Sequence, residues 1–260
     1  MSVKIAIIGG TGVYNPDIMN DIRDETVPTP YGDVQLKIGD YQGRQVAFMN
    51  RHGEKHSVPP HLVNYRANIA ALKKLGVKYV LATAAVGSLN PSMQPGHFVF
   101  VDQFLDFTKT RQTTFFEGGD AGVVHIDLTN PYCPGLRDIL SRAAREQGLI
   151  AHANGTYICT EGPRFETTAE IKMYRLFGGD LVGMTGVPEV ALAREAEMCY
   201  ATIAMVTNYA AGISSTNLTH QEVLDMMALN SENIRKLLMQ TVVWIDQERV
   251  CFCHHVIDPL

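Results

Sequence analysis

The sequence contains no block of like charge and no long apolar run. Its 22 basic and 27 acidic residues are interspersed and give a net charge of −5, so no surface is predicted to attract a nucleic acid backbone or an anionic membrane. No stretch approaches the roughly 20 apolar residues of a membrane-spanning helix, and the N-terminal segment MSVKIAIIGG lacks a secretory pattern. We therefore expect a cytoplasmic protein whose partners are small molecules or copies of itself, with no nucleic acid and no membrane.

Cysteine is also scarce, with five residues in 260. Three of them stand alone in apolar or turn contexts that are typical of buried, inert thiols, namely Cys133, Cys159 and Cys199. The other two, Cys251 and Cys253, belong to a Cys-Phe-Cys-His-His tail. A metal site, a disulfide between these two thiols and a plain C-terminal strand all remain open. Because no second ligand cluster with zinc-like spacing is apparent, we expect no bound metal.

Apolar β-branched runs alternate with amphipathic stretches, which is the pattern of an α/β fold. With 46% hydrophobic residues, the chain can bury one sizeable core, so we expect a single domain over residues 1–260 with an atypical tail over 246–260. Strands are predicted at residues 4–8, 45–49, 78–84, 98–102, 156–160, 181–184 and 202–207.

Three helices have clear start or stop signals. Between Pro59 and Gly76, apolar residues recur at helical spacing, with lysines in the last turn and the glycine directly after it. Capping-box patterns at Thr167 and Thr219 predict two more helices, of which the second runs to about Ile245. Residues 102–134 are rich in glycine and threonine, which predicts a long mobile or interface loop.

Three segments next to predicted strands carry groups that can bind a ligand. Residues 9–12, Gly-Gly-Thr-Gly, form either a phosphate-type anion site with Thr11 or merely a tight turn, and a dinucleotide site is disfavoured because a proline follows where a helix is required. Residues 50–56 concentrate cations, including Arg51 and His52, and fit either an anion site or a charged surface loop. The small residues at 83–89 permit either close approach of a ligand or tight packing.

Six motifs occur in a fixed order between Lys4 and Ile245: GGTG, RHG, AAVGSL, EGPRFET, MTGVPEV and TNYAAG. Together they resemble the family of methylthioadenosine phosphorylases and purine nucleoside phosphorylases. The resemblance implies a single α/β domain with a mixed, partly barrel-like sheet flanked by helices, working as a homotrimer or a dimer of trimers. It also implies a pentosyltransferase that uses inorganic phosphate as a co-substrate and needs no cofactor.

The same resemblance assigns the residues of a site. Phosphate would be bound by Thr11, Arg51, His52, Ala84, Ala85 and Thr185, a set whose guanidinium, hydroxyls and backbone donors suit a dianion. Phe165 would stack on the base, and the main chain of Met184 would bind the ribose. His125 would reach the ribose pocket of a neighbouring subunit, and the expected catalytic residues are Asn208 and His52.

Four positions of the resemblance concern the substrate. Asn208 and Ala210 stand where the methylthioadenosine enzymes carry two aspartates, and a neutral amide can donate to the oxygen of a 6-oxopurine. Glu166 resembles a glutamate that accepts the ring N–H of such a base, and His220 resembles a histidine that binds the ribose 5'-hydroxyl. These residues predict phosphate-dependent cleavage of guanosine and inosine to free base and ribose 1-phosphate, a purine-salvage reaction.

Two alternative functions remain compatible with the motifs. An S-methyl-5'-thioinosine or S-methyl-5'-thioadenosine phosphorylase would accept a thioether in place of the 5'-hydroxyl, and His220 is the residue that discriminates. A purine-binding module without catalysis would share the fold. The intact phosphate-binding set argues against that module, because a site without chemistry does not require a dianion cradle.

Overall fold

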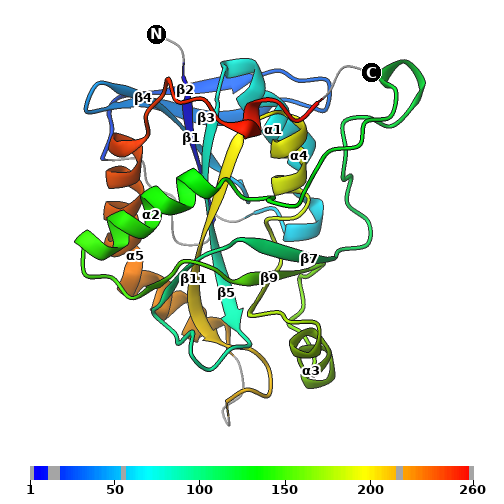
Figure 1. Ribbon diagram of the computed structural model, residues 1–260, viewed down its shortest axis with the longest axis vertical. Helices are drawn as coiled ribbons and strands as arrows, with labels where there is room; N and C mark the ends of the chain where they lie inside the picture. The colour runs from blue at the N-terminus through cyan, green and yellow to red at the C-terminus, as the bar shows by residue number, and fades with distance from the viewer. Residues whose placement is uncertain (1–2, 11–17, 54–56, 215–218, 258–260) are drawn as a thin grey trace.

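Eleven strands form one mixed sheet in the computed structural model, which describes residues 3–10, 18–53, 57–214 and 219–257. They are β1 (Ile5–Gly9), β2 (Asn20–Val27), β3 (Val34–Tyr41), β4 (Arg44–Asn50), β5 (Tyr79–Ser88), β6 (Phe98–Phe100), β7 (Gln103–Phe107), β8 (Ala151–His152), β9 (Thr156–Thr160), β10 (Leu181–Gly183) and β11 (Cys199–Tyr209). The order is β2-β3-β4-β1-β5-β10-β9-β7, while β11 pairs with β5 and β6, and β6 pairs with β8. Because β5 has three strand neighbours, the sheet branches there, in agreement with the predicted mixed α/β fold (Figure 1).

Two pairs of helices pack on this sheet, and a fifth helix, α3 (Thr168–Leu176), belongs to neither pair. The paired helices are α1 (Tyr65–Leu75), α2 (Pro134–Glu146), α4 (Glu189–Glu195) and α5 (His220–Trp244). Helix α1 packs on α4, and α2 packs on α5. Along β5, Val80 and Ala82 belong to the core cluster that includes α1 and α4, whereas Tyr79 and Leu81 belong to the cluster that includes α2 and α5. A strand that is buried on both faces has a mostly apolar sequence without polar alternation, and β5 has such a sequence. None of the described helices is long and apolar enough to cross a bilayer.

All seven predicted strands are present, and β5 and β11 are longer than predicted. The hairpin formed by β2 and β3 was not predicted. Strand β2 is almost entirely exposed and charged, so it has no apolar run to identify it. Strand β3 has buried Val34, Leu36 and Ile38 at alternate positions, which is the period-two signal of a half-buried strand.

The predicted helix start at Pro59 is wrong, because α1 begins at Tyr65. The side chain of Asn64 accepts from the Ala67 N–H at 3.1 Å and caps the helix there, and residues Pro60–Leu62 form a separate 3₁₀ turn. The predicted end is confirmed, since Gly76 adopts a left-handed φ of 88°. Both predicted capping boxes are present, at the starts of α3 and α5, whereas α2 and α4 were not predicted.

The prediction of a loop throughout residues 102–134 is wrong at its first residues. Strand β7 lies there and pairs in parallel with β9, a partner about fifty residues away that no local pattern identifies. The rest of the segment is irregular except for a 3₁₀ turn at Gly119–Ala121.

The C-terminal tail folds back over the start of β11, as Figure 1 shows for the red segment. Residues Phe252–His254 form a 3₁₀ turn, so the alternative of a plain strand is wrong. The buried sulfur atoms of Cys133, Cys199, Cys251 and Cys253 lie within 4.8 Å of one another. The expectation that no second ligand cluster accompanies the tail is therefore also wrong, because the fold joins cysteines that are far apart in the sequence. All five cysteines are free thiols.

Candidate active site

A cavity of about 410 Å³ opens where β5 exchanges one neighbour for another. Strand β1 pairs with β5 only as far as Ala82, and β10 pairs with β5 from Gly87 onward. Residues 83–86 therefore have no strand partner on this side. Ligands of open α/β sheets bind at such points, where neighbouring connections diverge at the carboxyl ends of strands.

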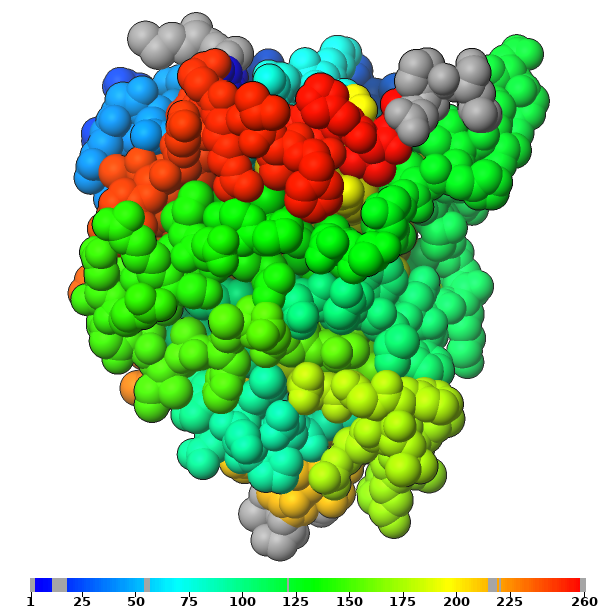
Figure 2. All heavy atoms as spheres, viewed as in Figure 1, coloured from blue at the N-terminus to red at the C-terminus, as the bar shows by residue number. Residues whose placement is uncertain are grey.

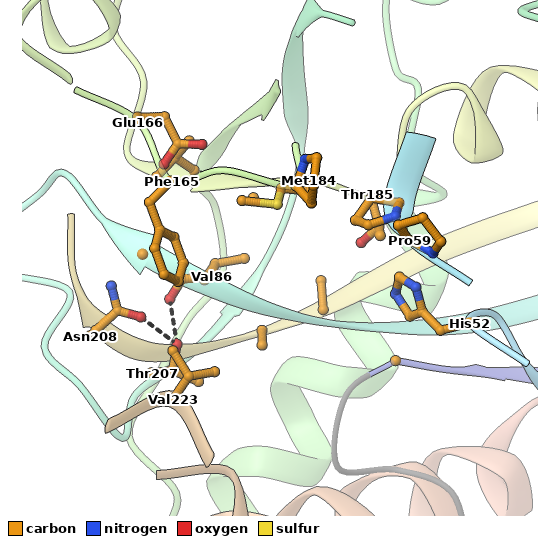
Figure 3. Close-up of a pocket in the computed structure, with 18 of the residues that line it drawn as sticks. His52, Pro59, Val86, Phe165, Glu166, Met184, Thr185, Thr207, Asn208 and Val223 are labelled. Atoms are coloured by element: carbon orange, nitrogen blue, oxygen red, sulfur yellow. Dashed lines mark hydrogen bonds between the residues drawn. The ribbon is translucent and has the colours of Figure 1, made fainter. Parts of the chain in front are cut away.

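The cavity brings most of the predicted site residues together. Those that line it are Arg51, His52, Ala84, Ala85, Phe165, Glu166, Met184, Thr185, Asn208 and Ala210. Figure 3 shows Phe165, Glu166 and Asn208 at one end and His52 and Thr185 at the other, with Met184 between them. Thr11 and the side chain of His220 lie outside the described residues, although His220 is the first residue of α5. His125 is exposed and does not line the cavity.

The backbone of β5 directs one donor into the cavity. Tyr79 N–H donates to the Lys4 carbonyl at 3.0 Å on the side of β1, and the Thr83 carbonyl accepts from Arg51 Nη1 at 2.9 Å on the same side. Alternate residues of a strand direct their N–H and C=O groups to the same edge. The N–H of Ala85 therefore points to this edge as well, beyond the last paired residue of β1.

Arg51 is fixed by a carboxylate that the sequence analysis missed. Its Nε and Nη2 donate to the two oxygens of Glu189, both at 2.7 Å, and the Tyr200 hydroxyl donates to the same carboxylate at 2.6 Å. Burial disfavours the charged guanidinium, but the Glu189 carboxylate outweighs burial, so the pKa of Arg51 is raised above its usual value. With side-chain exposures of 1% and 0%, the pair is shielded from water. Glu189 lies in the MTGVPEV motif, and this position is the signal in the sequence that could have identified it as a site residue.

His52 has a defined tautomer at this end of the cavity. Its Nδ1 lies 2.9 Å from the Val58 carbonyl oxygen. Because a carbonyl only accepts, Nδ1 carries a proton, and Nε2 is the unprotonated nitrogen of the neutral ring. Donation from Nε2 to an anion therefore requires the imidazolium form of His52.

Asn208 lies just past an irregularity in β11, where the pairing with β5 shifts register between Val206 and Asn208. Its Nδ2 donates to the Tyr209 carbonyl at 2.9 Å, which identifies this atom as the amide nitrogen, and Oδ1 accepts from the Thr207 hydroxyl at 2.7 Å. One Nδ2 hydrogen is used in this way. The second hydrogen is a donor available to a ligand, and none of the described residues has a recorded bond to it.

Glu166 presents the carboxyl group of a half-buried side chain to the same end. Its Oε1 accepts from the Thr160 hydroxyl at 2.7 Å. Burial raises the pKa of Glu166 above its usual value, and the hydrogen bond from Thr160 opposes this effect. Phe165 is 42% exposed and places an aromatic ring beside the cavity (Figure 3). This end therefore combines a ring face, an acid and an amide donor, which is a set suited to a flat heterocycle.

Arg111, from the irregular segment after β7, holds together the backbone segments that form the middle of the cavity wall. Its side chain is 1% exposed. Nη2 donates to the carbonyls of Thr160 at 3.1 Å and Met184 at 2.8 Å, and Nη1 donates to that of Val187 at 2.6 Å. These bonds connect the carboxyl ends of β9 and β10, which carry Glu166 and Thr185 in the segments that follow. No local sequence pattern distinguishes this arginine from an exposed loop residue.

Comparisons with known proteins identify the family of the chain. Residues 4–243 match the model of the phosphorylase superfamily. The chain is 62% identical to a probable 6-oxopurine nucleoside phosphorylase of Moorella thermoacetica, with 96% of each chain covered, and 55% identical to the 6-oxopurine nucleoside phosphorylase of Pyrococcus furiosus, again with 96% of each covered. A crystal structure of a methylthioadenosine phosphorylase from an antarctic soil metagenomic library superimposes with a TM-score of 0.92 at 39% identity, covering 98% of this chain and 91% of that one.

The match extends over nearly the whole chain, and the motifs that define the cavity lie inside it. The resemblance of the six motifs is thereby confirmed. The chain belongs to the phosphorylase superfamily, among its purine nucleoside phosphorylases and methylthioadenosine phosphorylases.

Proposed function

We propose that the protein is a purine nucleoside phosphorylase that cleaves 6-oxopurine nucleosides, guanosine and inosine, with inorganic phosphate. The observation that carries the proposal is that Glu166 and Asn208 both line the same end of the cavity. A 6-oxopurine presents a ring N–H to an acceptor and an oxygen to a donor. Glu166 supplies the acceptor, and the second Nδ2 hydrogen of Asn208 supplies the donor.

The other end of the cavity suits the phosphate. The Ala85 N–H and the Thr185 hydroxyl are donors there, Nε2 of His52 is a further donor when the ring is protonated, and Arg51 adds a cation whose position is fixed by Glu189. We propose Thr11 as a further phosphate ligand and Ala84 as a wall of this subsite. Because Glu189 offsets the charge of Arg51, most of the favourable interaction with a dianion comes from directed hydrogen bonds.

The reaction follows from these two ends. Cleavage of the glycosidic bond develops positive charge on the ribose carbon and negative charge on the departing purine. A phosphate held in line beside the anomeric carbon stabilises the cation and supplies the nucleophile without a bimolecular encounter. Donation from Asn208 relieves the charge on the base. In this proposal Phe165 stacks on the base, Met184 binds the ribose through its main chain, and no cofactor takes part.

The test is release of free base from inosine, guanosine, adenosine, methylthioadenosine and methylthioinosine, each with and without phosphate. The expected result is rapid cleavage of inosine and guanosine that disappears without phosphate. Preference for adenosine would contradict the roles of Glu166 and Asn208. Cleavage of none of the five would favour a purine-binding module without catalysis.

A second candidate is an S-methyl-5'-thioinosine phosphorylase, and one observation favours it. Val223, one turn further along α5 than His220, lines the cavity and offers an apolar contact to a thioether. This candidate keeps the base contacts of Glu166 and Asn208 and differs only at the 5' position. Methylthioadenosine is less suited, because its base has a lone pair where Glu166 requires an N–H.

The substitution His220→Val separates these two candidates. If His220 binds the 5'-hydroxyl, kcat/KM for inosine falls by about 10-fold, the equivalent of one hydrogen bond, and kcat/KM for methylthioinosine rises or stays constant. Gln221→Ala, at the next and exposed position of α5, is the matched control and should leave both values unchanged. An unchanged kcat/KM for inosine in His220→Val would favour the thioether substrate.

We further propose that the protein works as a homotrimer or a dimer of trimers. His125 is exposed and outside the cavity of its own chain, which suits a residue that completes the ribose pocket of a neighbour. We expect monomers obtained by dilution to lose nearly all activity. Light scattering combined with the inosine assay checks this, and a fully active, folded monomer would contradict it.

A further inference from the structure

Four thiols that the proposed reaction does not use lie together where the C-terminal tail packs on the body of the protein. Cys133 is the N-cap of α2, Cys199 is the first residue of β11, and Cys251 and Cys253 come from the tail. In Figure 2 the red tail lies directly against the green segment that leads into α2. The four sulfur atoms are buried and lie within 4.8 Å of one another, with Cys133 and Cys251 separated by 3.8 Å.

This spacing fits a tetrahedral metal ion. Zinc binds thiolates at about 2.3 Å, so the sulfur atoms of a tetrathiolate site are about 3.8 Å apart. A disulfide requires a separation of about 2.05 Å, and every cysteine of this group is a free thiol. The four residues supply the number and type of ligands that structural zinc sites use.

Nitrogen atoms of two side chains approach these sulfur atoms. His254 Nε2 lies 3.2 Å from the Cys199 sulfur, and Arg249 Nη2 donates to the Cys251 sulfur at 3.6 Å. Cys133 also lies at the N-terminus of α2, where the helix dipole favours a thiolate. N–H groups directed at metal-bound sulfur are the usual outer contacts of such sites.

We propose that these four thiolates bind one Zn²⁺ ion as a structural site. Binding releases the thiol protons and forms four Zn–S bonds, which leaves a net charge of −2 on the cluster and involves no oxidation. Arg249 offsets part of this charge. Access is provided by a second cavity of about 430 Å³ beside the cluster, lined in part by Arg249, Cys251 and His254.

The site would attach the tail to the body of the protein. Two ligands come from the tail and two from the starts of α2 and β11, so the ion connects segments that are distant in the sequence, with Cys133 and Cys251 118 residues apart. A metal bound only in the folded state adds its binding free energy to stability. The tail is then a stabilising device outside the active site.

The experiment is metal analysis by mass spectrometry of protein purified under reducing conditions without chelator. We expect one zinc per chain in the wild type and in Cys159→Ser, a buried cysteine outside the cluster. In the double variant Cys251→Ser with Cys253→Ser, the zinc content per chain should be at least about tenfold lower than in the wild type, since two of four ligands are removed.

Cobalt substitution gives an independent readout that does not depend on activity or on variants. Wild-type protein reconstituted with Co²⁺ should show the thiolate-to-cobalt absorption of a tetrahedral sulfur site, and the double variant should not. Wild-type protein without zinc in which all five thiols react with an alkylating reagent after unfolding would overturn the proposal. An intact mass that shows oxidised, disulfide-bonded cysteines would overturn it as well.

Discussion

Replacing Glu189 by glutamine is expected to reduce the free energy of unfolding by about 3–5 kcal/mol, the usual result of removing one partner of a buried ion pair. Arg51 is 3% exposed, and Glu189 is its carboxylate partner at 2.7 Å through two hydrogen bonds. A neutral amide leaves the guanidinium charge without compensation in a site shielded from water. Urea unfolding measures the loss.

The control for this substitution is Glu146→Gln, because Glu146 pairs with Arg142 on the exposed surface of α2 at 3.3 Å. An exposed pair contributes less than about 1 kcal/mol. Phosphate should also stabilise Glu189→Gln more than the wild type, since the dianion becomes the counter-ion of Arg51. Equal losses in the two variants, or no added effect of phosphate, would contradict the placement of Arg51 in the phosphate subsite.

Replacing Glu166 by glutamine should reduce the preference for inosine over adenosine by roughly 10- to 100-fold, which corresponds to about 1–3 kcal/mol. The charged acceptor of the purine N–H becomes a neutral amide, which can turn its nitrogen toward the lone pair of adenine. Values of kcat/KM for the two nucleosides measure the effect. Glu170→Gln is the control, because Glu170 lies in the same segment but does not line the cavity.

The pH dependence of this preference provides a second test of Glu166. Burial raises the pKa of this carboxyl group, so protonation in the unliganded protein begins at a higher pH than for an ordinary glutamate. The protonated acid loses the charge that accepts the ring N–H and gains a donor. The preference for inosine should therefore fall as the pH is lowered through this pKa, and it should be flat over the same range in Glu166→Gln.

Sequence patterns within a few residues predicted those helix ends that are set by nearby residues. The capping boxes gave the starts of α3 and α5, and the glycine after the lysines gave the end of α1. Arg51 was singled out because it follows a predicted strand, where the ligands of α/β sheets bind, whereas Asn208 was assigned through the family resemblance. Strand β2 was missed because an exposed edge strand carries no apolar signal.

Contacts between distant residues were beyond the reach of these patterns. Glu189 is 138 residues from Arg51 in the sequence, and Arg111 is 73 residues from Met184. Each pair depends on how β5, β10 and α4 are placed in three dimensions. The cysteine cluster has the same origin, since Cys133 and Cys251 are 118 residues apart. The sequence contains these residues, but only the packed sheet shows which ones meet.

Because the neighbour of β5 changes from β1 to β10 along its length, the backbone amides of β5 should differ in their rates of hydrogen exchange. The amides of Tyr79 and Leu81 face a paired strand, whereas the amide of Ala85 faces the cavity. Deuterium should therefore replace the Ala85 hydrogen quickly in the unliganded protein and slowly when phosphate is bound, while the rates of its paired neighbours stay nearly constant. A single amide in the middle of the sheet thus becomes a direct reporter of phosphate binding.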